Sequence, residues 1–122
     1  MSIKKVYLIR HGQTDYNVQC IVQGSGVDAP LNATGHWQAE QFYTHYRDLP
    51  FDKVYTSVLQ RAQQSVAGFI QDGIPHEAYE GLNEINWGPR EGTKITLEED
   101  RYYHDMIASW QAGETHKPIA GG

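Results

Sequence analysis

The feature that most constrains this chain is the apolar run KVYLI, residues 5–9, which breaks abruptly into the polar stretch RHGQTDYN. Successive side chains of a strand point to opposite faces, and this run is apolar on both of them. Such a strand is expected to be buried on two sides, as in a parallel sheet that helices cover. The run therefore predicts an α/β protein in which Gly12 ends the first strand.

The rest of the chain alternates between helical and extended patterns. Apolar residues recur at helix or strand spacing in five further segments, namely helices at 33–47, 58–71 and from 96 onward, and strands at 53–56 and 76–82. Ser57 and Gln60 fit a capping box at the start of the second helix. This order of strands and helices predicts a parallel sheet with helices on its faces. The glycine-bearing stretch 13–31 is expected to be a long loop, and loops of this length without structure of their own are usually functional or disordered.

Charge and cysteine content exclude several classes of protein. The 122 residues, enough for one domain, carry a formal net charge of −5 and no cluster of lysine and arginine. Nucleic-acid binding depends largely on neutralising phosphates, so this composition argues against it. The start, MSIKKVYLIRHG, has too short an apolar run for a signal peptide or membrane span, and the single Cys20 fits a reducing compartment. We therefore expect a cytoplasmic protein that binds neither nucleic acid nor membrane.

Charged side chains follow the end of each predicted strand. Arg10 and His11 follow the first strand. Ser57 and Arg61 come after the second strand, and Glu84 comes after the third. In parallel α/β sheets the carboxyl ends of the strands meet at one edge, where ligands bind. Two guanidinium groups and an imidazole at one edge suit a phosphoryl group, because its oxygens accept bidentate hydrogen bonds from arginine.

The same residues predict a reaction as well as a binding site. Neutral imidazole is a good nucleophile, so His11 could form a covalent phosphohistidine if a backbone carbonyl held its other ring N–H. Glu84 could protonate the leaving oxygen if burial or phosphate charge raised its pKa. Gly12 would let the backbone approach the anion. Asn17 could return from the loop as a further donor, although a simple loop cap is the competing interpretation for that residue.

Several segments, in order along the chain, resemble the histidine phosphatase superfamily of phosphoglycerate-mutase-like proteins. LIRHGQTDYN resembles the family signature RHGxTxxN, and VYTSVLQRAQQSV resembles its SxLxRAxQT stretch, with Ser65 for the usual threonine. VQGSGVDAPLNATGHWQAE resembles the family's loop and helix start, and LNEINWGPREG its LxExxxGxxEG stretch. The closing KPIAGG resembles the approach to its GGES motif. The resemblance implies a three-layer α/β/α sandwich with a mostly parallel central sheet.

Carried over to this sequence, the resemblance implies a role for each candidate residue. These roles are the phosphorylated nucleophile for His11, the proton donor for Glu84, phosphate contacts for Arg10, Asn17 and Arg61, and pocket lining for Gln23 and Gly24. No metal or organic cofactor is implied.

One family feature has no counterpart in this sequence. The family has a second essential histidine, in a Ser-His-Gly-like stretch. The other histidines stand outside such a stretch and are not expected to replace it; they are His36, His45, His76, His104 and His116. We therefore expect residues 1–122 to be a single, incomplete catalytic domain from the N-terminal part of a longer protein. Such a chain would expose a sheet edge and would be poorly stable or self-associate.

Three functions agree with these observations. The first is a phosphatase that hydrolyses a small phosphorylated metabolite through phosphohistidine. The second is a phosphoglycerate-type mutase, which returns the phosphoryl group to its substrate; NEINWGPREG differs from the aromatic-rich form of those mutases, so hydrolysis is favoured. The third is a non-catalytic binder of a phosphorylated ligand or an inactive fragment, because the pocket would lack one wall.

Overall fold

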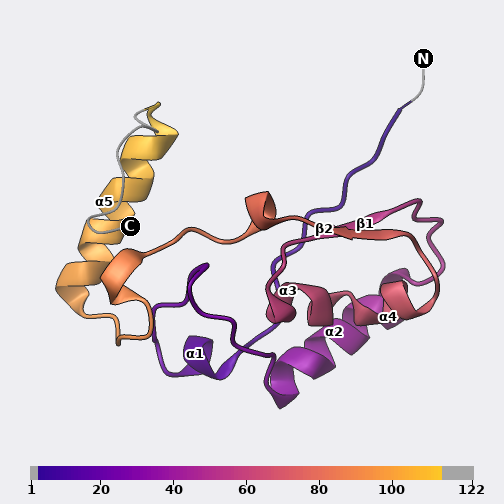
Figure 1. Ribbon diagram of the computed structural model, residues 1–122, viewed down its shortest axis with the longest axis horizontal. Coiled ribbons are helices and arrows are strands. Elements are labelled where there is room, and N and C mark those ends of the chain that lie inside the picture. Colours follow the sequence, from indigo (N-terminus) through magenta and orange to yellow (C-terminus); the bar gives the residue numbers. More distant parts are fainter. Residues whose placement is uncertain (1–2, 114–122) are drawn as a thin grey trace.

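The computed structural model describes residues 3–113 and combines short strands with helices (Figure 1). Its elements, in chain order, are α1 (Asp15–Val18), α2 (Ala33–Tyr46), β1 (Val54–Thr56), α3 (Gln60–Ser65), α4 (Ala67–Gln71), β2 (His76–Ala78), the 3₁₀ helices η1 (Glu80–Leu82) and η2 (Gly88–Arg90), and α5 (Leu97–Gln111). Within residues 3–113, no helix is long and apolar enough to cross a membrane.

Strands β1 and β2 form a parallel pair in which Val54 lies opposite His76 and Thr56 lies opposite Ala78. Helices α3 and α4 connect the two strands, and α2 packs against both helices on the same side of the pair (Figure 1). Parallel strands need such a crossover, because the chain must return to the same end of the sheet. The predicted parallel α/β architecture is confirmed, although β2 is shorter than the predicted strand because η1 begins at Glu80.

An aromatic cluster joins α2 and α4 to the segment that precedes β1. Phe69 of α4 is 3% exposed. The rings of Phe42, Tyr43 and Phe51 surround it, with centroids 5.5, 5.2 and 5.4 Å from its own. These rings are tilted or edge-on to Phe69, the arrangement that aromatic quadrupoles favour. The apolar stripe predicted for residues 33–47 therefore faces the core.

Residues 5–9 do not form the predicted first strand. They run past β1 (Figure 1), and their backbone makes no hydrogen bond to any other described residue. Tyr7 packs edge-on against Phe51, with ring centroids 5.2 Å apart, whereas Leu8 is 91% exposed. A strand is stabilised by a neighbouring ladder and by burial of its apolar faces. Since the described residues cover this segment on one side only, the predicted strand is absent from the described structure.

The helix predicted for residues 58–71 is divided, and it begins later than expected. Val66, with φ −123° and ψ 19°, separates α3 from α4. The capping box predicted for Ser57 and Gln60 is wrong. The Gln60 backbone N–H donates instead to the Asp28 carboxylate at 2.7 Å, and the Gln60 side chain donates to the Asp28 carbonyl at 2.5 Å. A residue of the long loop thus supplies the cap that sequence spacing assigned to a local serine.

The long loop is anchored near its start and in its middle. Near its start, Thr14 caps α1 through a capping box with Asn17. Further along, Ile21 forms an antiparallel bridge with Lys94. Val22 is 4% exposed and packs against Trp87 and two residues of α5, Met106 and Trp110. The loop therefore has structure of its own, and α5 is attached to the molecule through it.

Candidate active site

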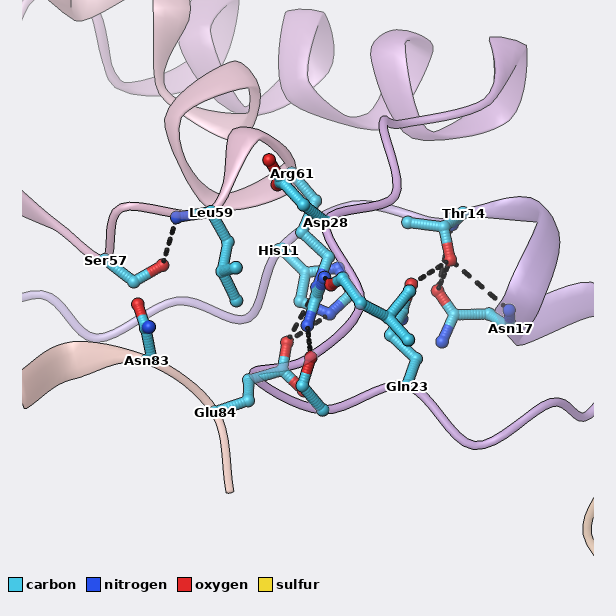
Figure 2. A network of polar contacts seen from close by, with 12 residues as sticks. His11, Thr14, Asn17, Gln23, Asp28, Ser57, Leu59, Arg61, Asn83 and Glu84 are labelled. Atoms are coloured by element: carbon cyan, nitrogen blue, oxygen red, sulfur yellow. Dashed lines mark hydrogen bonds and ion pairs between the residues drawn. The ribbon is translucent and has the colours of Figure 1, made fainter. Parts of the chain in front are cut away.

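A cavity of about 280 Å³ lies where β1 ends and α3 begins. Its polar lining comprises Arg10, His11, Thr56, Ser57, Arg61, Ser65 and Glu84. Three of these side chains, from distant parts of the sequence, converge in Figure 2: His11 from the N-terminal segment, Arg61 from α3 and Glu84 from the segment after η1. Arg10, His11, Arg61 and Glu84 meet here as expected, although the segment before Arg10 is extended chain and not the predicted strand.

The His11 ring is held at both nitrogens, and its side chain is 8% exposed. Nδ1 lies 2.6 Å from the carbonyl oxygen of Gly12, and Nε2 lies 2.8 Å from Glu84 Oε1. A carbonyl can only accept, so Nδ1 carries a proton and donates it to Gly12. The Nε2 contact needs a second proton, shared between the imidazole and the carboxylate. The nitrogen that would attack phosphorus is therefore the one that faces Glu84.

Arg61 is the most buried charged side chain of the cavity, with 0% exposure. Its Nε donates to Glu84 Oε1 at 3.0 Å. Its terminal nitrogens donate to two carbonyls of the long loop, Gly24 at 3.0 Å and Val27. A buried guanidinium needs such partners, because an unpaired buried charge is strongly destabilising. Arg61 thereby fixes the loop and places a positive charge beside His11.

Glu84 is 40% exposed at its side chain, and one oxygen, Oε1, receives donors from both His11 and Arg61. Burial raises the pKa of Glu84, but the hydrogen bonds from His11 and Arg61 together lower it more, so its pKa lies below the usual 4.5. Burial alone therefore does not meet the condition set for Glu84 as a proton donor, which was a pKa raised by burial or by phosphate charge. Glu84 is thus a carboxylate that contacts His11 and Arg61 rather than a carboxyl group held neutral by burial.

Arg10 lines the same cavity but is exposed. It makes no ion pair or hydrogen bond with the described residues, in contrast to the buried Arg61. A guanidinium without a protein partner can turn both of its edges toward a phosphate. Of the two predicted phosphate-binding arginines, Arg10 is thus the one whose donors are free.

Asn17, Gln23 and Gly24 lie beside the cavity and do not line it. The Asn17 side-chain oxygen accepts from the Thr14 backbone N–H at 2.9 Å. This is the geometry of a loop cap, the alternative to a phosphate contact for Asn17. Gln23 accepts from the Thr14 hydroxyl at 2.8 Å (Figure 2). Gly24 contributes its carbonyl to Arg61. Their roles at the phosphate stay predictions.

Gly12 lies close to the backbone of Gly35. The sequence had instead predicted that this glycine lets the backbone approach an anion. A Cβ at Gly12 would lie 2.7 Å from the carbonyl oxygen of Gly35, in the first turn of α2. A Cβ at Gly35 would lie 2.1 Å from the carbonyl oxygen of Gln13. Both positions therefore need glycine, and their contact fixes the turn that carries His11 against α2.

Three residues of this region were not predicted from the sequence: Thr14, Gly35 and Ser65. Thr14 is fully buried and joins Asn17 to Gln23. Its capping box has asparagine where the sequence signature has glutamate or glutamine, so the pattern did not reveal it. Ser65 stands four residues after Arg61, on the same helix face, and that spacing is a signal that could have marked it.

The other histidines are dispersed. His36 and His45 lie on α2, and His104 lies on α5. His76 of β2 lies 2.8 Å from the Thr56 hydroxyl, next to the cavity lining. His116 and the KPIAGG segment lie outside the described residues. Within the described part of the chain, no group of three or more histidine, cysteine, aspartate or glutamate side chains could hold a metal ion.

Comparisons with known proteins identify the family and the fold of this chain. Residues 6–122 match the histidine phosphatase superfamily, branch 1. A broad-specificity phosphatase from Saccharomyces cerevisiae is 38% identical over 107 residues, and a 2,3-bisphosphoglycerate-dependent phosphoglycerate mutase from Cytophaga hutchinsonii is 32% identical over 117. The crystal structure of the α-ribazole phosphatase from Shigella flexneri superposes with a TM-score of 0.71 at 30% identity. The fold is therefore phosphoglycerate-mutase-like.

The matches cover most of this chain but only part of each relative. The aligned residues are 83% of this chain and 46% of the Saccharomyces phosphatase, and 93% of this chain and 54% of the Cytophaga mutase. For the Shigella structure, the shares are 93% and 56%. The chain thus spans about half the length of the curated relatives it matches.

Proposed function

Because this chain belongs to branch 1 of the histidine phosphatase superfamily, we propose that it provides the nucleophile for hydrolysis of a small phosphorylated metabolite through a phosphohistidine at His11. The observation that carries this proposal is the placement of the His11 ring, between the Gly12 carbonyl at 2.6 Å and the Glu84 carboxylate at 2.8 Å. The contact with Gly12 orients the ring. The contact with Glu84 provides a path by which a proton can leave Nε2 and later reach the leaving oxygen.

In the first step, the proton between Nε2 and Glu84 moves to the carboxylate. This leaves a lone pair on Nε2, which attacks phosphorus as the bond to the leaving oxygen breaks. Glu84 then gives its proton to that oxygen. A single proton thus activates the nucleophile and neutralises the leaving group. The products are the free alcohol and phosphohistidine.

In the second step, water attacks the phosphohistidine. The Glu84 carboxylate takes a proton from the water, the P–N bond breaks, and inorganic phosphate leaves. The proton then returns to the contact between Glu84 and Nε2. Negative charge develops on the transferring oxygens in both steps, and Arg10 and Arg61 are the cations that lie at the cavity to stabilise it.

The phosphoglycerate-type mutase is the second candidate, and the Cytophaga mutase, at 32% identity, supports it. A mutase shares the first step and then returns the phosphoryl group to an alcohol instead of water. The non-catalytic phosphate binder is the third candidate, and it requires only the cations of the cavity. For location we propose the reducing cytoplasm, in accord with the single free Cys20. We also propose that the chain self-associates through its exposed N-terminal segment.

The test is turnover of p-nitrophenyl phosphate by protein expressed from its natural reading frame, compared with His11→Ala, with the intact mass of both proteins recorded. We expect His11-dependent release of phosphate and an acid-labile phosphoryl adduct on the wild type alone. Transfer of the adduct to added 3-phosphoglycerate, without release of phosphate, would establish the mutase. Binding of inorganic phosphate without turnover or adduct would establish the non-catalytic binder and overturn the proposal.

A further inference from the structure

One buried hydroxyl connects the turn that carries His11 to the helix that carries Arg61. Ser65, at the end of α3, is 5% exposed. Its Oγ lies 2.8 Å from the backbone nitrogen of Gly12 and 2.7 Å from the backbone carbonyl of Arg61. From this bridge we infer that Ser65 is a positioning residue, one that orients the His11 ring through Gly12. The inference rests on the proposed function, in which His11 is the nucleophile.

The direction of each hydrogen bond follows from its partners. The Arg61 carbonyl can only accept, so the single hydroxyl proton of Ser65 is donated to it. The Gly12 N–H can only donate, so it donates to a lone pair of the same oxygen. The hydroxyl therefore has one orientation. A chain of two bonds runs from Gly12 through Ser65 to Arg61, and each bond polarises the other.

Gly12 is in turn what orients the imidazole. Its N–H is held by Ser65, and its Cα side lies against the backbone of Gly35. With Gly12 anchored in this way, its carbonyl lies 2.6 Å from His11 Nδ1, and the N–H of the same peptide group, which belongs to Gln13, donates to Gln38 Oε1 at 2.8 Å. A ring nitrogen that donates to a fixed carbonyl directs the opposite nitrogen, Nε2, in one direction. Ser65 thus acts on the nucleophile at a distance of one residue, without touching the ring itself.

The same hydroxyl sets the spacing between nucleophile and cation. Arg61 and Ser65 belong to one turn of α3, so the bond to Gly12 ties the His11 turn to the backbone of Arg61. Loss of the hydroxyl would leave the half-buried Gly12 N–H without its partner and would free the turn to move relative to α3. Small misplacements of reacting groups are costly, up to about 100-fold in rate for a shift of 1 Å.

The test compares Ser65→Ala with Ser65→Thr, which retains the hydroxyl and is the residue that the family motif usually carries. Phe69→Leu is the control for stability, because it weakens the aromatic core without touching Gly12. The readouts are the exchange-protected ¹H–¹⁵N signal of the His11 Nδ1 proton and the kinetic constants for p-nitrophenyl phosphate. We expect Ser65→Ala to lose the ring signal and to lower kcat by about 10- to 100-fold with little change in KM. Ser65→Thr should keep the ring signal and kcat of the wild type. Phe69→Leu should lower Tm and leave the ring signal and kcat unchanged.

A Ser65→Ala protein with a wild-type ring signal and wild-type kcat would overturn the inference. A loss of kcat that Phe69→Leu reproduces at equal loss of Tm would also overturn it, because a general loss of stability would then explain the effect. If the wild type does not turn over p-nitrophenyl phosphate, the proposed function fails separately. The ring signal, which needs no substrate, still decides whether Ser65 orients His11.

Discussion

At the scale of single residues, Glu84 Oε1 contacts both His11 and Arg61. This position predicts that the effect of removing the carboxylate depends on how readily the leaving group departs. Glu84→Gln removes the carboxylate that takes the proton from His11 and passes it to the departing oxygen. We expect kcat to fall by about 100- to 10,000-fold for an alkyl phosphate such as glycerol phosphate. The loss should be smaller for p-nitrophenyl phosphate, because nitrophenolate leaves without a proton and only the activation of His11 and of water is lost. Equal losses for both esters in steady-state assays would contradict the acid role.

The lowered pKa of Glu84 also predicts how stability depends on pH. Burial raises this pKa, and the hydrogen bonds from His11 and Arg61 outweigh burial, so the folded value lies below the unfolded value near 4.5. The contacts therefore stabilise the fold above that value, and their contribution disappears as pH falls through the lower folded pKa. Because the side chain is 40% exposed, we expect about 1 kcal/mol or less at neutral pH.

The measurement for this pH dependence is urea unfolding of the wild type and of Glu84→Gln, from neutral to strongly acidic pH. The difference in the free energy of unfolding should shrink toward zero in acid. Glu40→Gln, at an exposed position of α2, is the matched control and should show no such trend. A difference that grows as pH falls would contradict the sign of the pKa shift.

Residue types and predicted strand ends indicated which charged groups meet, although the segment before Arg10 forms no strand in the described structure. Arg10, His11, Arg61 and Glu84 all follow predicted strands, and the geometry of parallel sheets brings such positions to one edge. The Ser65 hydroxyl was not predictable in this way. Its partner, Gly12, is 53 residues away in the sequence, and a helix serine usually bonds locally or to water. Long-range polar pairs of this kind depend on tertiary contact, which no local pattern encodes.

At the scale of elements, the close contact between the His11 turn and α2 predicts that position 35 does not tolerate a side chain larger than that of glycine. A Cβ at Gly35 would lie 2.1 Å from the Gln13 carbonyl, so Gly35→Ala must push the first turn of α2 away from the turn. We expect a loss of about 1–3 kcal/mol in the free energy of unfolding. Gly81→Ala is the control, because a Cβ there meets nothing within 4 Å. Thermal unfolding followed by circular dichroism would reveal the difference, and equal Tm values for the two variants would contradict it.

Element boundaries were predicted less well than element types, for reasons that particular residues make clear. The capping box at Ser57 satisfied the local pattern, yet Asp28 of the long loop provides the cap, because a carboxylate at 2.7 Å from the Gln60 N–H outcompetes the nearby serine. The KVYLI pattern predicted burial on both faces, but burial depends on what lies beside a segment. In the described part of the chain only one side of residues 5–9 has apolar neighbours such as Phe51.

At the scale of the whole molecule, the N-terminal segment is an exposed apolar surface with unpaired backbone. Ile3, Val6 and Leu8 are 86%, 78% and 91% exposed. The backbone of residues 5–9 forms no hydrogen bond with the rest of the described chain. An extended apolar segment with free N–H and carbonyl groups is a template for pairing with another strand. A second copy of this chain presents an identical segment, so the two can pair and bury these side chains together.

We therefore predict that the 122-residue chain self-associates, with an apparent mass that rises with concentration in sedimentation velocity. Val6→Lys combined with Leu8→Lys should reduce this association, because paired strands would bring the new charges together while the exposed positions cost the folded monomer little. Leu97→Lys is the matched control. Leu97 is 92% exposed, at the start of α5, so lysine there adds positive charge on a different element, one charge against the two of the double variant. A chain that stays monomeric at every attainable concentration, or one whose association responds equally to Leu97→Lys, would show that residues 5–9 are not the contact surface.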